Sequence, residues 1–253
     1  LISESGGIWD ANVVGKGIVE KALCTNPPFD IYFGIDGWRV DTYQYNDLPF
    51  MNRCNAALFE EYPDMFITGE NAVQNIYSQA YHVRNNINLP FKSNLPSPND
   101  FVLQTAINDA LNQNFDWGKG FNRIYQVLSM DALYQNPDLN MTFVDNHDQD
   151  RYFSVIGEDL NKYKLGLGFL LTTRGTPHLY YGTEVLMKNF KNPSDAEVRQ
   201  DFPGGWAEDT VNKFTANGRT GKENEAFNFV KTLANFRKNS SALTTGKLMQ
   251  FLP

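Results

Sequence analysis

Residues 33–41, with the sequence FGIDGWRVD, form a largely apolar run that ends in an acid, and this pattern decides the expected fold. Side chains alternate between the two faces of a strand, so Arg39 and Asp41 are expected on one face and Trp38 and Val40 on the other. A positive and a negative group then project together at the carboxyl end of the strand, where α/β barrels hold their active sites. Taken alone, this pattern fits a structural Arg–Asp pair equally well.

The same ending occurs twice more along the chain. Residues 65–70, MFITGE, end in Glu70, and residues 143–148, FVDNHD, end in His147 and Asp148. A charge at the end of an apolar strand is costly unless it is solvated or paired. Singly, Glu70 can cap a helix and His147 can be an ordinary hydrogen-bonded histidine. Three acids at one rim repel each other, which is expected to raise at least one pKa, and glycoside hydrolysis needs one protonated and one ionised carboxyl.

Short strand-like runs alternate with helical patterns, which predicts an α/β fold with a parallel sheet. Strands are expected over residues 31–41, 65–70, 139–146 and 169–173, with a weaker one over 92–95. Helical spacing of apolar residues is found over residues 50–58, 102–110 and 226–236. These make about five β/α units, whereas a closed barrel needs eight, so an incomplete (β/α)8 barrel is expected. Residues 1–30 offer only a modest helical stretch over 11–23.

The composition excludes several classes of partner. The net charge is −7 and the pI about 5.0, so no basic surface is available for nucleic acid. The sequence contains no run of 18 apolar residues, so no membrane span is predicted. Cys24 and Cys54 form no C-x-x-C pair, so neither a disulfide framework nor a zinc ribbon is indicated. Aromatic residues make up 14% of the chain, which fits a protein that stacks sugars, and Tyr43 is one candidate ring.

Several of these stretches, taken in order, match a known family. Residues 37–41 (GWRVD), 69–70 (GE) and 143–148 (FVDNHD) resemble three sequence blocks of the α-amylase family, glycoside hydrolase family 13. Residues 99–101 (NDF) and 174–184 (RGTPHLYYGTE) are similar to its sixth-strand and eighth-strand segments. Residues 36–43 and 200–206 (QDFPGGW) resemble the neopullulanase and cyclomaltodextrinase branch. The resemblance covers roughly residues 33–240 and implies barrel strands four to eight, in a fragment that begins just before the fourth strand.

The resemblance also implies roles for the acids. Asp41 is expected to be the nucleophile, Glu70 the general acid/base, and Asp148 the third active-site carboxylate, which binds sugar hydroxyls. Arg39 is expected to orient Asp41, and His147 to donate to a sugar hydroxyl. The implied reaction is double displacement with retention on an α-glucan oligosaccharide or polysaccharide. It implies no metal or organic cofactor in bond breaking, a structural calcium in a full-length parent, and a periplasmic or secreted location.

The sequence departs from the family at its start. The family's third-strand block, with its own Asp and His, has no match, and neither has the domain inserted after that strand. We therefore expect an N-terminal segment of uncertain structure over residues 1–32, the barrel part over 33–240, and the beginning of a C-terminal β domain over 241–253. Five units leave two unpaired sheet edges, so the chain alone is expected to be unstable or inactive.

Three alternatives stay open. The first is a transglycosylase or disaccharide isomerase of the same family. The second is a non-catalytic fragment that only binds carbohydrate or a protein partner. The third is a metal-dependent isomerase or hydrolase on the same architecture, with Asp41, Glu70, His147 and Asp148 as ligands. The sequence does not distinguish α-1,4, α-1,6 and cyclic glucans, and it leaves the oligomeric state open.

Overall fold

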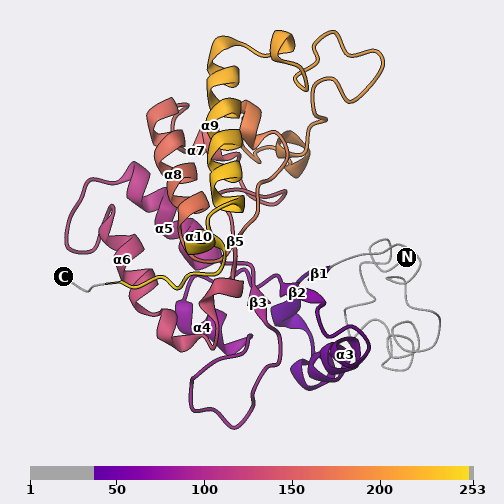
Figure 1. Cartoon of the computed structure of the whole chain (residues 1–253), viewed down its shortest axis with the longest axis vertical. Coiled ribbons are helices and arrows are strands. Elements are labelled where there is room, and N and C mark those ends of the chain that lie inside the picture. The colour runs from indigo at the N-terminus through magenta and orange to yellow at the C-terminus, as the bar shows by residue number, and fades with distance from the viewer. Residues whose placement is uncertain (1–36, 251–253) are drawn as a thin grey trace. The chain divides into compact units, whose positions relative to one another are not determined.

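The computed structural model describes residues 37–250 of the chain (Figure 1). These residues divide into two compact units, each described by itself below. The first contains residues 37–102 and 130–141, and the second contains residues 103–129 and 142–250. The helix expected over 11–23, Cys24, and the strand residues before Gly37 lie outside the described part. Between residues 37 and 250, no helix has the length and apolar character needed to cross a bilayer.

The first unit is built around a parallel sheet. Its elements, in chain order, are β1 (Gly37–Val40), η1 (Tyr43–Tyr45), α3 (Leu48–Glu61), β2 (Phe66–Gly69), α4 (Ile76–Tyr81), β3 (Ser97–Pro98), η2 (Asp131–Leu133) and η3 (Pro137–Leu139). β2 pairs in parallel with β1 on one side and with β3 on the other. A parallel bridge also joins Asn99 to Met141, the first residue of β4 (Met141–Thr142). The expected parallel sheet is thereby confirmed.

Helix α3 supplies much of the apolar core of this unit. Asp47 caps its first turn by accepting a hydrogen bond from the backbone N–H of Phe50 at 2.8 Å. The helix then buries apolar side chains at helical spacing, and these pack in one cluster with Val40 of β1 and Ile67 of β2. The buried residues of α3 in that cluster are Phe50, Met51, Cys54 and Leu58. The helix expected over residues 50–58 is confirmed, and it packs against β1 and β2.

The second unit consists mainly of helices. Its elements are α5 (Phe101–Asn112, which begins at the end of the first unit), α6 (Asn122–Ser129), α7 (Tyr152–Val155), α8 (Leu160–Thr172), β5 (Thr176–Pro177), η4 (Thr183–Val185), η5 (Asp195–Val198), η6 (Ala216–Gly218), α9 (Gly221–Lys238) and α10 (Ser241–Thr244). Helices α8 and α9 lie side by side in Figure 1 and are in contact. The helices expected over residues 102–110 and 226–236 are confirmed as parts of α5 and α9.

Two of the expected strands are wrong. Residues 169–173 are not a strand: residues up to Thr172 belong to α8, whose buried side chains Tyr163, Leu167 and Leu170 recur at helical spacing. Gly166 occurs inside this helix because a Cβ there would collide with the hydroxyl of Tyr152. The strand of this region is β5, a few residues later. Residues 92–95 also form no strand, and β3 follows them at Ser97–Pro98.

The described strands do not close a barrel. β4 and β5 form a two-stranded sheet, and β1, β2 and β3 form the three-stranded sheet. The strand expected over residues 139–146 is reduced to Met141–Thr142, and His178 N–H donates to Thr142 O at 2.7 Å just after β5. Residues 241–244 form α10 and residues 245–250 are neither helix nor strand, so a β domain beginning there stays a prediction.

Candidate active site

Arg39 and Asp41 meet at the carboxyl end of β1. Arg39 projects from the exposed side of the strand while Val40 is buried, as the alternation predicts. Arg39 Nη1 donates to Asp41 Oδ1 at 2.7 Å. The side chain of Asp41 is 59% exposed, so its second oxygen can be reached from solvent. The ion pair therefore orients the Asp41 carboxylate in an accessible position.

Glu70 leaves the neighbouring strand at the same edge of the sheet. The parallel register pairs Val40 with Gly69, so Asp41 and Glu70 are the next residues of the two strands. Glu70 Oε1 lies 3.3 Å from Arg39 Nη2, and its side chain is only 10% exposed. One guanidinium thus contacts both carboxylates, through a different terminal nitrogen for each. The structure brings Arg39, Asp41 and Glu70 together, and their roles stay predictions.

A backbone contact that the sequence did not reveal also holds Glu70. Thr42 N–H donates to Glu70 Oε2 at 2.8 Å. Thr42 has a φ of 47°, a left-handed conformation that is unfavourable for a β-branched residue. Such a conformation persists only where the surroundings hold it, and here the contacts to Glu70 and from Asn46 Nδ2 to Thr42 O do so. The turn after Asp41 is therefore tied to the second carboxylate.

Gly69 leaves room for the core side chains that pack next to Glu70. A Cβ at Gly69 would lie 2.6 Å from Leu95 Cδ2 and 2.8 Å from Tyr43 Cγ, so only glycine fits before Glu70. Tyr43 itself is fully buried, and Asn55 Nδ2 donates to its hydroxyl at 3.1 Å. Burial raises the pKa of the Tyr43 phenol to about 12. The hypothesis that Tyr43 is a sugar-stacking ring is wrong, because the ring belongs to the core. Trp38 also packs against this core.

His147 and Asp148 lie together in the second unit. His147 Nε2 is 3.0 Å from Asp148 Oδ2, so the two predicted side chains are in contact. Arg199, which the sequence analysis did not select, bonds to both residues: Nη2 is 2.5 Å from Asp148 Oδ1, and Nε donates to His147 O at 2.8 Å. Arg199 follows η5 in a loop without periodicity, 51 residues from Asp148, so no local signal connects them. The convergence of this group with Asp41 and Glu70 stays a prediction.

Asp145 supports the backbone that carries His147 and Asp148. It is buried and accepts hydrogen bonds from Tyr152 N–H and from Thr183 Oγ1, both at 2.9 Å. Burial raises the pKa of Asp145 to about 6, although these donors and the charge of Arg151 act in the opposite direction. Asp145 therefore has a structural position inside the motif, whereas Asp148 is partly exposed.

A metal centre on these acids finds no support in the geometry. Among residues 37–250, no three His, Cys, Asp or Glu side chains are grouped so that they could hold an ion. The contacts of Asp41, Glu70 and Asp148 described above are with arginines, a histidine and a backbone N–H instead. Whether the reaction proceeds without a metal stays a prediction.

Parallel strands that end in acids at one sheet edge are typical of an α/β enzyme, and comparison with known proteins gives the family. The family model described as "Alpha amylase, catalytic domain" matches residues 19–213. The chain therefore belongs to the α-amylase family, glycoside hydrolase family 13. Its curated relatives include both glycoside hydrolases and transglycosylases.

Individual relatives give the extent of the likeness. The chain is 29% identical over 234 residues to a cyclomaltodextrin glucanotransferase of Geobacillus stearothermophilus, covering 92% of the chain and 29% of the relative. It is 26% identical to an α-amylase of Niallia circulans, covering 89% of the chain and 39% of the relative. An α-amylase from Geobacillus thermoleovorans, solved with acarbose, superimposes with a TM-score of 0.67 at 21% identity, covering 86% of this chain and 43% of that one. The chain thus spans about a third of the length of these curated relatives.

Proposed function

We propose that the protein is a retaining glycosidase that cleaves the α-glucosidic bonds of starch-type glucans. The observation that carries the proposal is the contact of one guanidinium, Arg39, with both Asp41 and Glu70 at a common sheet edge. Retention requires two carboxyl groups close enough to act on one sugar, typically about 5 to 5.5 Å apart. Contact of both carboxylates with one guanidinium brings them close together, which supports the proposal.

The reaction follows from the different surroundings of the two acids. The exposed Asp41 attacks the anomeric carbon, the bond to the glycosidic oxygen breaks, and Glu70 gives its proton to the departing oxygen. Glu70 then takes a proton from water, which attacks the anomeric carbon and releases Asp41 from its ester. Both Glu70 oxygens have a donor nearby, Thr42 N–H at Oε2 and Arg39 Nη2 at Oε1, and these contacts orient the carboxyl group. Asp148 and His147 bind sugar hydroxyls.

A second candidate is transglycosylation on the same site. The likeness to a cyclomaltodextrin glucanotransferase over 92% of the chain favours it. The first step is unchanged, and a sugar hydroxyl replaces water in the second. The finer placement near neopullulanases and cyclomaltodextrinases rests on residues 36–43 and 200–206. A solved cyclomaltodextrinase, with a TM-score of 0.69 at 22% identity, supports it at the level of the fold alone.

The test is product analysis on soluble starch, pullulan and cyclodextrins. Reducing ends measure hydrolysis, chromatography detects transfer or cyclic products, and NMR of the first product reports its anomer. We expect the α-anomer to be released first, and Asp41→Asn to lower kcat by about a thousandfold or more. Asp64→Asn, at an exposed position of the same unit, is the matched control and should leave kcat unchanged. Release of the β-anomer, or an active Asp41→Asn protein, would refute the proposal.

Glu70→Gln separates the acid from the nucleophile. Loss of the proton donor should slow cleavage of an ordinary glucan far more than cleavage of an aryl glucoside whose leaving group needs no proton. Equal losses on both substrates would argue against Glu70 as the general acid.

A further inference from the structure

The loop between α5 and α6, residues 113–121, holds its backbone in a defined shape. The carbonyl oxygen of Trp117 accepts hydrogen bonds from the side chains of Asn122 and Gln126, both on α6. Trp117 N–H donates to Asp116 Oδ1 at 2.7 Å, and Lys119 N–H donates to Asp116 O at 3.2 Å. Gly120 has a φ of +59°, and a Cβ there would lie 3.0 Å from the backbone of Phe115. The loop is therefore closed by its own bonds.

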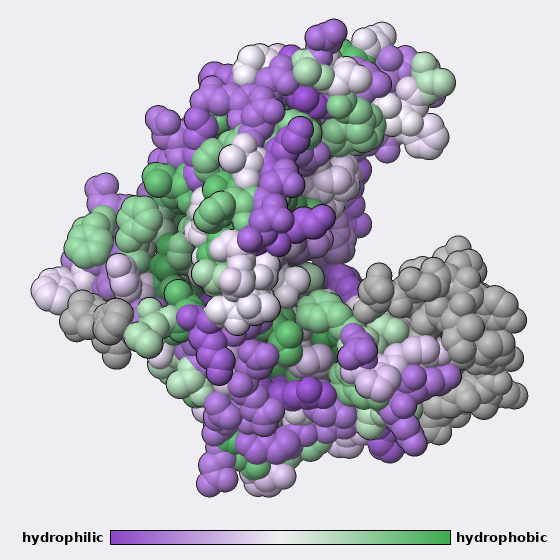
Figure 2. Space-filling view, viewed as in Figure 1, coloured by the Kyte–Doolittle hydropathy of each residue, from purple (hydrophilic) through white to green (hydrophobic). Residues whose placement is uncertain are grey.

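The loop of residues 113–121 exposes two large aromatic rings. Trp117 is 92% exposed and Phe115 is 76% exposed, so neither ring contributes to the core. Phe121 and Tyr125, at 47% and 50%, are also exposed at the start of α6, where they line a different pocket. Figure 2 shows hydrophobic side chains over this loop, bordered by hydrophilic ones. Apolar rings held in water by a rigid backbone are costly to keep there, and such surfaces commonly mark binding sites.

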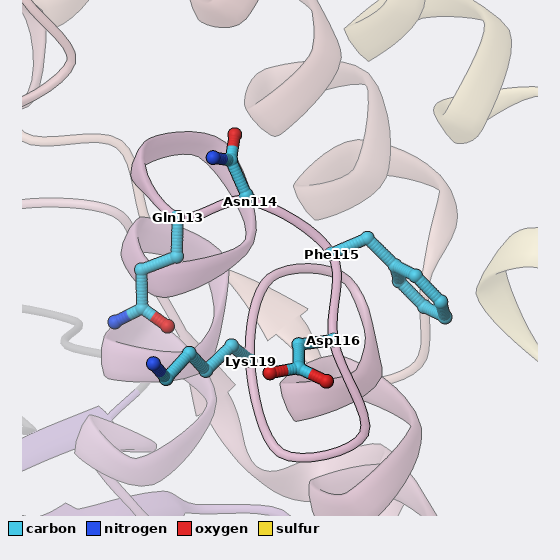
Figure 3. Close-up of a pocket in the computed structure, with 5 residues that line it drawn as sticks. All are labelled: Gln113, Asn114, Phe115, Asp116 and Lys119. Carbon is cyan, nitrogen blue, oxygen red and sulfur yellow. The ribbon is translucent and has the colours of Figure 1, made fainter.

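A pocket of about 470 Å³ lies in the same loop and includes Phe115 in its lining (Figure 3). It is lined by Gln113, Asn114, Phe115, Asp116 and Lys119. In Figure 3 the amide of Gln113 and the ammonium of Lys119 lie on the same side of the loop, and the ring of Phe115 extends on the other side of Asp116. The volume falls within the range of small-ligand sites, about 300 to 1,000 Å³. Amide, carboxylate and ammonium groups thus border an aromatic surface.

We propose that this loop is a second carbohydrate-binding site, which holds a short segment of α-glucan through residues other than those that break the bond. A glucosyl ring has apolar C–H faces and a rim of hydroxyls, which match exposed aromatic rings beside donors and acceptors. The net charge of −7 disfavours a polyanion at the same place. None of Arg39, Asp41, Glu70, His147 and Asp148 belongs to the loop. The inference rests on the proposed function for the identity of the sugar.

The test measures binding separately from turnover. In an Asp41→Asn background, which spares the polysaccharide, the full chain is titrated with soluble starch by affinity electrophoresis. Trp117→Ala is expected to raise the Kd for starch by about tenfold, and Phe115→Ala to raise it by less. Phe236→Ala, which removes a ring that is 59% exposed on α9, is the matched control and should leave the Kd unchanged. Thermal unfolding should be unaltered in all three variants, because these rings are exposed.

Activity assays separate this inference from the proposed function. With Asp41 restored, Trp117→Ala should leave kcat/KM on a short maltooligosaccharide unchanged. If the wild-type protein does not cleave glucans but Trp117→Ala still weakens starch binding, the proposed function fails and the loop site stands. An unchanged Kd for Trp117→Ala, no starch binding by the Asp41→Asn protein, or a change in oligomeric state caused by Trp117→Ala would overturn the loop site. The last result would assign the surface to protein association.

Discussion

Arg39 contacts both of the predicted catalytic carboxylates, Asp41 and Glu70. A lysine at this position keeps the charge but is a point donor, so it cannot contact Asp41 and Glu70 through two fixed nitrogens. We expect Arg39→Lys to lower kcat by roughly tenfold to a hundredfold, with little change in KM, because the carboxylates lose their alignment. Steady-state kinetics on a maltooligosaccharide provide the measurement. Arg53→Lys, on α3, is the control, and a wild-type kcat for Arg39→Lys would contradict a positioning role.

Asp145 should make stability depend on pH with a sign unusual for an aspartate. Its pKa is raised to about 6 in the folded chain from an ordinary value of 3.8, so between these values the native state holds a proton that the unfolded state has lost. The free energy of unfolding is therefore expected to fall as the pH rises from about 4 to about 6, by on the order of 3 kcal/mol. The groups that face Asp145 are Arg151, Tyr152, Thr183 and Glu184.

Urea unfolding between pH 4 and pH 7 checks this expectation. Asp145→Asn cannot ionise, so its free energy of unfolding should lose that part of the pH dependence. Asp201→Asn, at an exposed position of the same unit, should keep the wild-type slope. The same slope in Asp145→Asn and wild-type protein would show that other groups cause it.

At the scale of elements, α9 offers a clean measure of what capping contributes. Thr220 forms a capping box: its hydroxyl accepts from Glu223 N–H at 3.3 Å, and its own N–H donates to Glu223 Oε2 at 2.8 Å. Thr220→Ala removes one of these bonds and should lower the free energy of unfolding by about 1 kcal/mol. Ser240→Ala is the control, because Ser240 begins α10 without a side-chain cap bond. Chemical denaturation measures the free energy of unfolding of both variants. An equal loss in Thr220→Ala and Ser240→Ala would contradict the capping role.

Helices and strands whose apolar residues follow one clear period could be predicted from the sequence. Elements whose secondary structure depends on tertiary packing could not. The strand before Glu70 and helices α3, α5 and α9 follow directly from alternation or helical spacing. The strand predicted over residues 169–173 was wrong because a short apolar run fits a strand and a buried helix equally well. The Tyr152 hydroxyl beside Gly166 explains why a glycine occurs inside this helix, and the sequence gives no sign of that contact. β3 and β4 are too short to produce a pattern.

Part of the candidate site could likewise be predicted from the sequence, and part could not. Alternation along one strand was enough to predict that Arg39 and Asp41 lie on one face, and the acid after β2 marked Glu70. Arg199 and the N–H of Thr42 could not be predicted, because neither a long-range ion pair nor a backbone donor in a left-handed turn leaves a local pattern. The packing of Leu95 and Tyr43 against Gly69 is a tertiary contact, which the sequence alone does not reveal.

At the scale of the whole molecule, the acids are distributed over two compact units, Asp41 and Glu70 in the first and Asp148 in the second. The proposed reaction uses only side chains, so we expect glucan cleavage to persist after dialysis against EDTA. Residual activity is compared with the melting temperature of the same sample, because loss of a structural ion would lower both together. Activity lost at an unchanged melting temperature, and restored by a divalent cation, would favour the metal-dependent alternative.

The bond between Thr42 N–H and Glu70 bears on how a sugar complex of this protein should be captured. Replacing Glu70 with Gln leaves one oxygen and one NH₂ facing two donors, so either Arg39 or Thr42 loses its acceptor and the turn that follows the nucleophile is free to relax. Asn in place of Asp41 keeps an oxygen for Arg39 and leaves that turn intact. A crystallographer who wants an undistorted view of a bound oligosaccharide should therefore disable the nucleophile and leave the proton donor in place.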